Sequence, residues 1–363
     1  MTGTNTPDHT DRMVACMLGG AIGDAMGAGV EFMSLAEIRR RFGAAGITGY
    51  VPAYDRMGAI TDDTQMTLFT TEGMIRSSVR GRSKGIHHTP SVVRHAYLRW
   101  LATQHDGGPV PGHPMHDGWL FTVKGLHTRR APGSTCLAAL AAGGAGSVSN
   151  PINDSKGCGG VMRSAPAGFP VLPAAQRFRL GCDIAALTHG HPEGYLPAGF
   201  LAVAVGALID GMGMVDALDR AEQQLALDAG DSNTLSAVRE ARGIGRTGVP
   251  TPERLELLGG GWVGHEALAI AVACAASTPD FRGGILAAAN HSGDSDSTAA
   301  IAGNLLGAAK GTAALPPEWR AELELADVIE QLARDAALEL RGAPPADEWG
   351  EPTEAWLARY PGA

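Results

Sequence analysis

The sequence predicts an all-α fold, and three observations support this prediction. Apolar residues recur at helical spacing in eight segments, and the alternation typical of strands is almost absent. Glycines stand between these segments and at their ends, where they supply the left-handed conformations that terminate helices. The predicted helices cover residues 12–27, 63–79, 91–101, 174–188, 195–209, 263–276, 281–289 and 295–309.

The segments divide the chain into one domain and two ends. We expect a flexible N-terminus over residues 1–10, a single domain over residues 11–341, and a Pro-rich, polar tail over 342–363 that ends in a short docking helix. Within the domain, residues 81–131 are dense in Gly and Pro and hold seven of the twelve His. This segment is predicted to form irregular loops around one helix, and such loops are often functional.

Charge and cysteine usage exclude several classes of protein. The formal charge is −9 and no run of Lys or Arg forms a basic face, so nucleic-acid binding is not expected. No apolar stretch approaches the ~20 residues of a membrane span, and the polar start lacks a signal-peptide pattern, so we expect a cytoplasmic protein without membrane contact. Five scattered Cys without a CxxC pair indicate reduced thiols rather than disulfides or a zinc site.

Two clusters of acids stand where helices are predicted to begin. The first is residues 61–64 (Thr-Asp-Asp-Thr), and the second is residues 293–298 (Gly-Asp-Ser-Asp-Ser-Thr). Either alone is explained by helix capping. If the two clusters face each other, Asp62, Asp63, Asp294 and Asp296 supply a charge of −4, which balances two divalent cations. Ligation by oxygen alone favours Mg²⁺ or Mn²⁺ over zinc.

One competing motif overlaps the second cluster. Residues 294–298 fit the DxDxT pattern of haloacid-dehalogenase-type phosphatases, in which the first Asp follows a buried strand. The preceding residues 288–293 are small and polar where that fold needs β-branched residues, and the chain has no alternating βα pattern. The sequence therefore disfavours the phosphatase interpretation.

Five blocks, in a fixed order along the chain, carry a resemblance to a known family. They are residues 19–27 (Gly-Gly-Ala-Ile-Gly-Asp-Ala-Met-Gly) followed by Glu31-Phe32, residues 61–64, residues 157–163 (Gly-Cys-Gly-Gly-Val-Met-Arg), Thr188-His189, and residues 293–297. On these residues the chain resembles the ADP-ribosylglycohydrolase family over most of its length. The resemblance implies an orthogonal all-α bundle with a dinuclear Mg²⁺ or Mn²⁺ centre in a central cleft.

The resemblance also implies roles for individual residues. The implied metal ligands are Thr61, Asp62, Asp63, Asp294, Asp296, Ser297 and, as a mobile ligand, Glu31. The implied substrate-binding residues are Ser155, Gly157, Cys158, Gly159, Gly160, Met162, His189 and Trp262. Two positions depart from the family: many relatives have Thr in place of Ser297, and relatives often read Gly-Asn-Gly where Cys158 stands between glycines.

A mechanism follows from these implied roles. The metals would hold the ribose diol and lower the pKa of a bound water, and Asp62 or Asp63 would take its proton. Glu31 would close the site or assist proton transfer to the leaving acceptor. The glycines of residues 157–160 would let backbone N–H groups approach the diphosphate near a helix start at about Val161.

Several of these residues have a simpler structural explanation. The glycines of residues 19–29 favour a tight helix crossing, and Asp24 can cap or pair locally. His189 can interact with the end of a helix, Trp262 is expected to fill the core, and Arg163 can pair with an acid or with phosphate. The loop histidines are expected to be exposed. Four loop residues are candidates for the acceptor site: Asp106, His113, His116 and Asp117.

The sequence therefore predicts a hydrolase of the glycosidic bond between ADP-ribose and a modified acceptor, which reverses ADP-ribosylation. The acceptor is an ADP-ribosylated protein or a small molecule, with arginine preferred, and ADP-ribose is the product. The alternative is a catalytically inactive ADP-ribose-binding or crystallin-like structural member of the same fold. The presence of all the implied ligands disfavours that alternative.

Overall fold

The structure is a computed structural model that describes residues 8–105 and 116–362. Within these residues it contains helices and three isolated β-bridges but no strand, so the predicted all-α fold is confirmed. The α-helices are α1 (His9–Gly27), α2 (Leu35–Phe42), α3 (Asp62–Lys84), α4 (Thr89–Thr103), α5 (Ser134–Ala141), α6 (Ala174–Ala186), α7 (Pro192–Ile209), α8 (Met214–Ala229), α9 (Asn233–Gly245), α10 (Pro252–Leu255), α11 (Gly264–Ser277), α12 (Phe281–Ala289), α13 (Ser295–Lys310), α14 (Pro317–Glu322), α15 (Ala326–Arg341) and α16 (Glu354–Arg359). The 3-10 helices are η1 (Leu120–Thr122), η2 (Lys124–Leu126), η3 (Cys158–Gly160), η4 (Ala165–Gly168), η5 (Glu256–Leu258) and η6 (Thr312–Ala314).

Each of the eight predicted helices is present, although some ends differ. α1 begins at His9, because the Asp8 side chain accepts a hydrogen bond from the N–H of Asp11 and caps the helix. Residues 9 and 10 therefore belong to α1, and residues 1–7 lie outside the described part. α3 continues to Lys84 and ends where Gly85 adopts a left-handed conformation (φ 71°), so residues 81–84 of the segment predicted to be irregular are helical.

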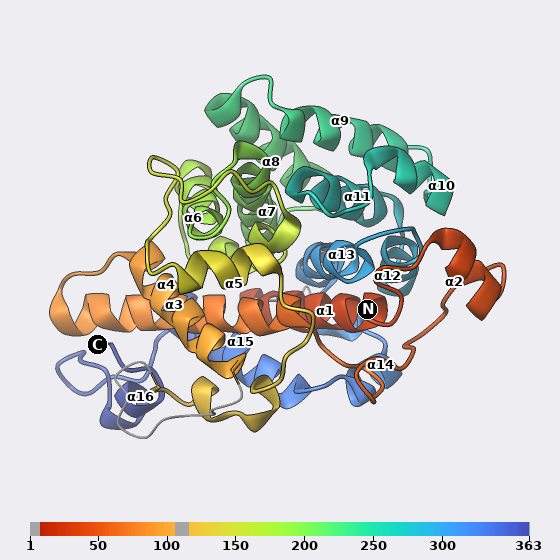
Figure 1. Cartoon of the computed structure of the whole chain (residues 1–363). Helices are drawn as coiled ribbons and strands as arrows, with labels where there is room; N and C mark the ends of the chain where they lie inside the picture. Colours follow the sequence, from red (N-terminus) through yellow and green to blue (C-terminus); the bar gives the residue numbers. More distant parts are fainter. Residues whose placement is uncertain (1–7, 106–115, 363) are drawn as a thin grey trace, which may run out of the picture.

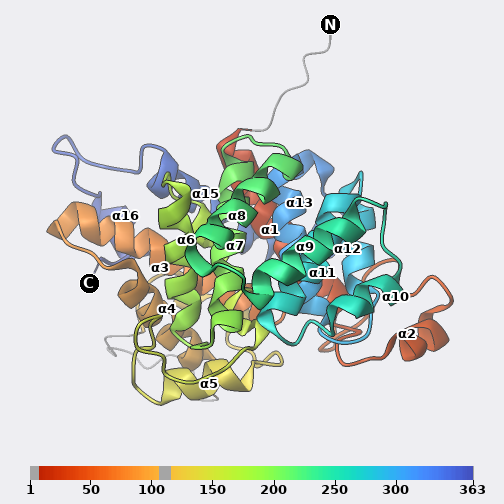
Figure 2. The same cartoon turned by 90° about the horizontal axis from the view of Figure 1, so that it is seen from above.

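The central contact of the fold is the crossing of α1 and α13, which lie side by side in Figures 1 and 2. Glycines permit this close approach: a Cβ on Gly23 would lie 2.0 Å from the carbonyl oxygen of Ala299, and one on Gly27 would lie 2.3 Å from the backbone nitrogen of Asp296. The packing role expected for these glycines is confirmed. The crossing brings the end of α1 against the start of α13.

Two further apolar helices, α7 and α11, complete the buried centre. In Figure 1, α8, α9 and α10 cover one side of this centre, and α14, α15 and α16 lie on the opposite side. α7 is long and apolar enough to span a membrane, but 89% of its apolar window is buried within the protein, as in a core helix of a globular domain.

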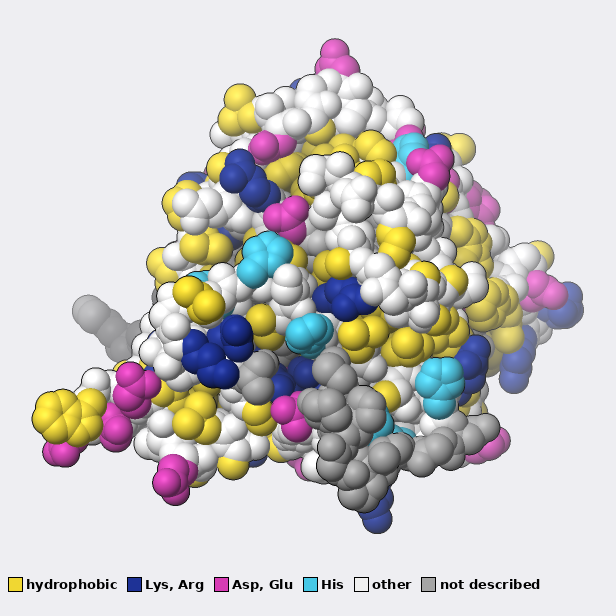
Figure 3. Space-filling model, turned by 60° about the vertical axis from the view of Figure 1, so that its left-hand side comes forward, with side chains coloured by type: hydrophobic (Ala, Val, Ile, Leu, Met, Phe, Trp, Pro, Cys, Tyr) yellow, Lys and Arg dark blue, Asp and Glu magenta, His cyan; other side chains and the backbone are white. Residues whose placement is uncertain are grey.

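The C-terminal tail carries the short helix α16, which packs on α15. Trp356 donates a 2.9 Å hydrogen bond from Nε1 to Glu339, and the hydroxyl of Tyr360 donates to Asp335. Both rings are buried, whereas Trp349 is 82% exposed. On the face drawn in Figure 3, acidic and basic side chains are interspersed rather than gathered in one large patch of a single sign.

Candidate metal centre

The starts of α3 and α13 meet at one cavity of about 380 Å³. Asp62 and Asp63 line it from α3, and Asp294, Asp296 and Ser297 line it from the start of α13. Glu31, on the segment that follows α1, joins them: one carboxylate oxygen from each of Glu31, Asp294 and Asp296 lies within 4.8 Å of the others. The assumption that the two acidic clusters face each other is therefore confirmed.

These carboxyl groups are buried together, which is costly when they are ionised. Burial, and after it the charge of Asp296, raises the pKa of Asp63 and of Glu31 above their usual ranges. Burial also raises the pKa of Asp62 and of Asp294. In addition, Asp63 Oδ1 is buried and has no hydrogen-bond partner among the described residues. This set of oxygen donors with uncompensated negative charge fits hard divalent cations.

Asp24 joins α1 to the start of α3. Its fully buried carboxylate accepts hydrogen bonds from the N–H (2.9 Å) and the hydroxyl (2.8 Å) of Thr61, and from the N–H (3.1 Å) and the hydroxyl of Thr64. The Thr61 hydroxyl donates its hydrogen to Asp24 and accepts a 3.3 Å hydrogen bond from the N–H of Asp63, so its oxygen keeps one lone pair for another partner. The structure therefore places Thr61 next to the acidic cluster, behind the side chains that line the cavity.

A turn before α5 forms one wall of the cavity and orients Asp62. The N–H of Gly133 donates to Asp62 Oδ2 at 3.1 Å, and the N–H of Asp62 donates to the carbonyl of Arg130 at 3.1 Å. Sequence reasoning did not propose this wall as part of the site, although Pro132-Gly133 before a run of small residues is a recognisable turn signal. The residues it contributes to the lining are Ala131, Pro132, Gly133, Ser134, Thr135 and Cys136.

The glycine-rich loop at η3 forms a second, adjoining wall. A Cβ on Gly157 or on Gly159 would lie 3.2 Å from His189 Nε2, so these two glycines keep space beside that ring. Gly160 faces elsewhere, since its Cβ would lie 2.6 Å from the carbonyl of Gly194 and it is absent from the lining. The structure thus gives Gly160 a packing position instead of the expected substrate contact.

Ser155 also stands behind the cavity wall. Its hydroxyl lies 3.2 Å from the hydroxyl of Thr135 and accepts a 3.4 Å hydrogen bond from the N–H of Gly157. It supports the glycine loop from outside the lining, contrary to the direct contact expected from sequence.

Two sulfur-containing side chains approach the second acidic cluster. The thiol of Cys158 donates to Asp294 Oδ2, and the Ser297 hydroxyl lies 3.8 Å from both Cys158 Sγ and Met162 Sδ. Burial, followed by the charge of Asp294, raises the pKa of the Cys158 thiol, so the thiol form is favoured. All four residues line the cavity.

Trp262 stands at the cavity rather than in the core, so the core position favoured by the sequence is wrong. Its ring stacks on Phe32 with centroids 5.2 Å apart, and both rings are partly exposed. Backbone pairing places it there, because the N–H of Cys158 donates to the carbonyl of Trp262 and the N–H of Gly264 donates to the carbonyl of Lys156. Phe32, which follows Glu31, adopts a positive φ of 68°.

His189 lines the cavity, and Arg163 lies behind it. Arg163 is fully buried, does not line the cavity and makes no ion pair within residues 8–105 and 116–362, so the expected pairing with an acid is not found. Its guanidinium donates to the hydroxyl of Thr188 at 2.6 Å, and this hydroxyl lies 2.8 Å from His189 Nδ1. The His189 ring therefore bonds to the Thr188 side chain through Nδ1, and it also lines the cavity.

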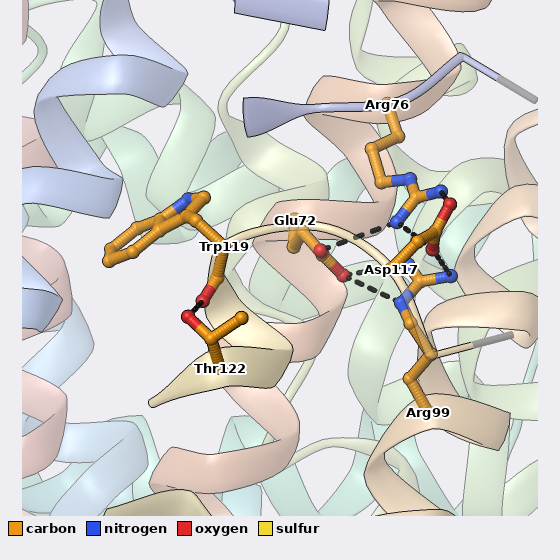
Figure 4. A network of polar contacts seen from close by, with 6 residues as sticks. All are labelled: Glu72, Arg76, Arg99, Asp117, Trp119 and Thr122. Atoms are coloured by element: carbon orange, nitrogen blue, oxygen red, sulfur yellow. Dashed lines mark hydrogen bonds and ion pairs between the residues drawn. The ribbon is translucent and has the colours of Figure 1, made fainter. Parts of the chain in front are cut away.

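The His-rich segment contributes little to the cavity among the residues described. Asp117 forms an ion pair with Arg76 at 2.9 Å within a network that includes Glu72 and Arg99, so it has a structural role (Figure 4). His116 stacks on Phe121 with centroids 4.7 Å apart. Asp106 and His113 lie outside the described residues. Within residues 81–131, Ala131 is the described residue that lines the cavity.

The phosphatase alternative is not supported by the local backbone. Asp294 is the N-cap of α13 and follows a short turn after α12, where that alternative requires a strand. A left-handed Gly293 (φ 116°) and a 2.9 Å hydrogen bond from the N–H of Asp294 to the carbonyl of Gly260 shape this turn.

Comparisons with known proteins agree with the family resemblance found in the sequence. The sequence model of a family described as ADP-ribosylglycohydrolase matches residues 5–346. An ADP-ribosyl-[dinitrogen reductase] glycohydrolase from Rhodospirillum rubrum is 28% identical over 94% of this chain and 99% of its own length. An ADP-ribosylarginine hydrolase Tri1 from Pseudomonas putida is 27% identical over 92% of this chain and 80% of its own length.

A solved structure is similar in fold. It is titled ADP-ribosylglycohydrolase-related protein complex, and it matches with a TM-score of 0.62 and 24% sequence identity over 90% of this chain and 97% of the other. At this identity the likeness concerns the fold alone.

Proposed function

The chain belongs to the ADP-ribosylglycohydrolase family, and we propose that it removes ADP-ribose from modified arginine side chains. The enzyme class, a hydrolase acting on glycosidic bonds of ADP-ribose, follows from the family. The observation that carries the proposal is the meeting of Glu31 and the two acidic clusters in one cavity beside a glycine-rich loop. The choice of arginine follows the name of the relative from Pseudomonas putida.

We further propose that the centre holds two divalent cations, Mg²⁺ or Mn²⁺. The ligands would be Thr61, Asp62, Asp63, Asp294, Asp296, Ser297 and Glu31, all of which offer oxygen atoms. The unpartnered Asp63 Oδ1 and the raised pKa values of the cluster support this proposal, because cations offset the cost of burying several carboxylates. When bound, such cations would supply Lewis-acid activation of water and a template for the ribose diol.

The side chains divide the proton transfers between them. Asp62 Oδ2 accepts a hydrogen bond from Gly133, whereas Asp63 keeps a buried oxygen without a protein donor, so Asp63 is better placed to accept a proton from the attacking water. Glu31 lines the same cavity from the segment that follows α1, which places its carboxyl group to assist proton transfer to the leaving nitrogen of the acceptor.

The remaining lining is suited to the ADP part of the substrate. Because Gly157 and Gly159 have no Cβ, a diphosphate can approach the backbone closely here, and the N–H of Gly159 is the one proposed to meet it, since the N–H of Gly157 already donates to Ser155. His189 lies beside them, and Trp262 with Phe32 offers an aromatic surface to the adenine at the mouth of the cavity.

The test compares acceptors and metals with one product assay. Purified protein is incubated with ADP-ribosyl-arginine and ADP-ribosyl-serine peptides in Mn²⁺, in Mg²⁺ and in excess chelator, and released ADP-ribose is measured. We expect faster release from the arginine peptide, and no release in chelator. Faster release from the serine peptide would overturn the choice of arginine as the acceptor. Binding of ADP-ribose without release from either peptide would favour the catalytically inactive binding protein.

A further inference from the structure

Arg163 is a buried cation that has no carboxylate partner among the described residues. Its side chain is fully buried, and its guanidinium carbon lies 4.3 Å from the centre of the Tyr97 ring. One terminal nitrogen contacts sulfur atoms of Met66 and Cys136, and the other donates to Thr188 Oγ1 at 2.6 Å.

The direction of the next hydrogen bond follows from this donation. An arginine can only donate, so Thr188 Oγ1 accepts from Arg163 and still carries one hydrogen of its own. His189 Nδ1 lies 2.8 Å from the same oxygen. If Nδ1 carried a proton, two donors would point at one hydroxyl oxygen, and the buried hydroxyl hydrogen would lose its nitrogen acceptor. The favoured arrangement has the hydroxyl donate to Nδ1.

The charge state of His189 agrees with this arrangement. Burial, and after it the positive charge of Arg163, lowers the pKa of His189 to about 3, so the ring is neutral at physiological pH. A neutral imidazole carries one proton, and with Nδ1 accepting from Thr188 that proton is on Nε2. Nε2 faces the positions where Gly157 and Gly159 lack a Cβ, and it has no hydrogen-bond partner among the described residues.

We infer that Arg163 and Thr188 are positioning residues that hold His189 as the tautomer protonated on Nε2, so that its ring presents a hydrogen-bond donor to a ligand oxygen in the cavity. The identity of that oxygen rests on the proposed function: beside the glycine loop it belongs to the diphosphate of ADP-ribose. Because Arg163 polarises the Thr188 hydroxyl, the chain of hydrogen bonds also passes part of the buried positive charge toward the anion.

The tautomer is measured directly by nitrogen NMR of full-length protein labelled with ¹⁵N-histidine. The two His189 nitrogens are assigned with a His189→Gln variant, and a protonated nitrogen is distinguished from an unprotonated one by its chemical shift. Two matched variants follow: Thr188→Val removes the hydroxyl at nearly constant shape, and Thr188→Ser keeps it. Affinity for ADP-ribose is measured by calorimetry for each protein.

We expect a wild-type spectrum with the proton on Nε2, and an Nε2 signal that moves when ADP-ribose is added. Thr188→Val should mix the tautomers and weaken ADP-ribose binding about tenfold, whereas Thr188→Ser should behave as the wild type. A wild-type proton on Nδ1 overturns the inference even if the valine variant does not fold. Unchanged tautomer and affinity in a folded valine variant also overturn it.

These outcomes are separable from failure of the proposed function. If the tautomer is as expected but ADP-ribose leaves the Nε2 signal in place, the assignment of the diphosphate to His189 is wrong. If ADP-ribose moves the signal and no acceptor is hydrolysed, the proposed catalysis fails while the positioning role stands.

Discussion

Asp24, in the last turn of α1, accepts hydrogen bonds from both the N–H and the hydroxyl of Thr61, the N-cap residue of α3. The buried carboxylate of Asp24 therefore accepts hydrogen bonds that water would accept at an exposed helix start. The same helix start carries Asp62 and Asp63. The carboxylate fixes the Thr61 hydroxyl and holds the first acidic cluster against the end of α1. This contact makes Asp24 a residue that orients the proposed ligands without lining the cavity.

An Asp24→Asn substitution tests that role. The amide nitrogen would face donors on Thr61 and Thr64, so we expect a loss of about 1–3 kcal/mol in the free energy of unfolding and a fall of about tenfold in Mn²⁺ affinity. Urea unfolding and calorimetric titration measure the two effects. Asp280→Asn is the matched control, because Asp280 caps α12 at an exposed site and Asn caps almost as well. Unchanged Mn²⁺ affinity in Asp24→Asn would contradict the orienting role.

The stability of the metal-free protein should fall as the pH rises. Burial, and after it the charge of Asp296, raises the pKa of Asp24 to about 7, and burial raises the pKa values of Asp62, Asp63 and Asp294. A carboxyl group with a raised folded-state pKa stabilises the protein fully below its unfolded pKa of about 4, and this contribution is lost as the pH rises through the folded pKa.

Urea unfolding at about pH 5 and pH 8, in chelator and in Mn²⁺, measures this dependence. We expect a clear loss of stability at the higher pH in chelator and a smaller loss in Mn²⁺, because cations favour the ionised carboxylates. Equal pH dependence in both conditions would argue against cation binding by the cluster.

The Phe32–Trp262 pair should contribute to ligand affinity. Trp262→Ala removes the stacked ring at the mouth of the cavity, and we expect ADP-ribose affinity to fall by about two- to tenfold, with Trp262→Phe retaining most of it. Calorimetry with ADP-ribose gives the comparison. Full affinity in the alanine variant would remove this pair from the proposed binding surface.

The crossing of α1 and α13 has a sharp steric test. Gly23→Ala would place a Cβ 2.0 Å from the carbonyl oxygen of Ala299, so we expect destabilisation of about 1–3 kcal/mol. Gly243→Ala in α9 is the control, since no heavy atom lies within 4 Å of its Cβ, and it should be neutral or slightly stabilising. Thermal unfolding measures the stability of both variants. Equal stability of Gly23→Ala and Gly243→Ala would show that α1 and α13 can move apart without cost.

The fold class and the main helices were predictable because apolar periodicity is a local signal. The long helices α1, α3 and α13 follow from it, and so does the position of the acids at helix starts. α15 carries the same kind of signal, an apolar stripe that includes Ile329, Leu332 and Ala336, but the sequence prediction left it out. α5 is short and Ala-rich, with no polar face to define its period.

The candidate site was predictable in part. The residues of the two acidic clusters were found, but their meeting depends on the glycine-mediated crossing of α1 and α13, which joins residues far apart in the sequence. Trp262 was placed wrongly because its position depends on backbone pairing between residues 156–158 and 262–264. The burial of Arg163 against Tyr97 and Thr188 likewise has no local signal.

The most direct test of the account is release of ADP-ribose from an ADP-ribosyl-arginine peptide by wild-type protein and by Asp63→Asn, each with Mn²⁺ and with chelator. The account predicts turnover by the wild type only with Mn²⁺, and a loss of at least about 100-fold in Asp63→Asn while ADP-ribose still binds. Release by the wild type that persists in chelator, or an Asp63→Asn variant as active as the wild type, would contradict the claim that the clusters at the starts of α3 and α13 form a catalytic metal centre.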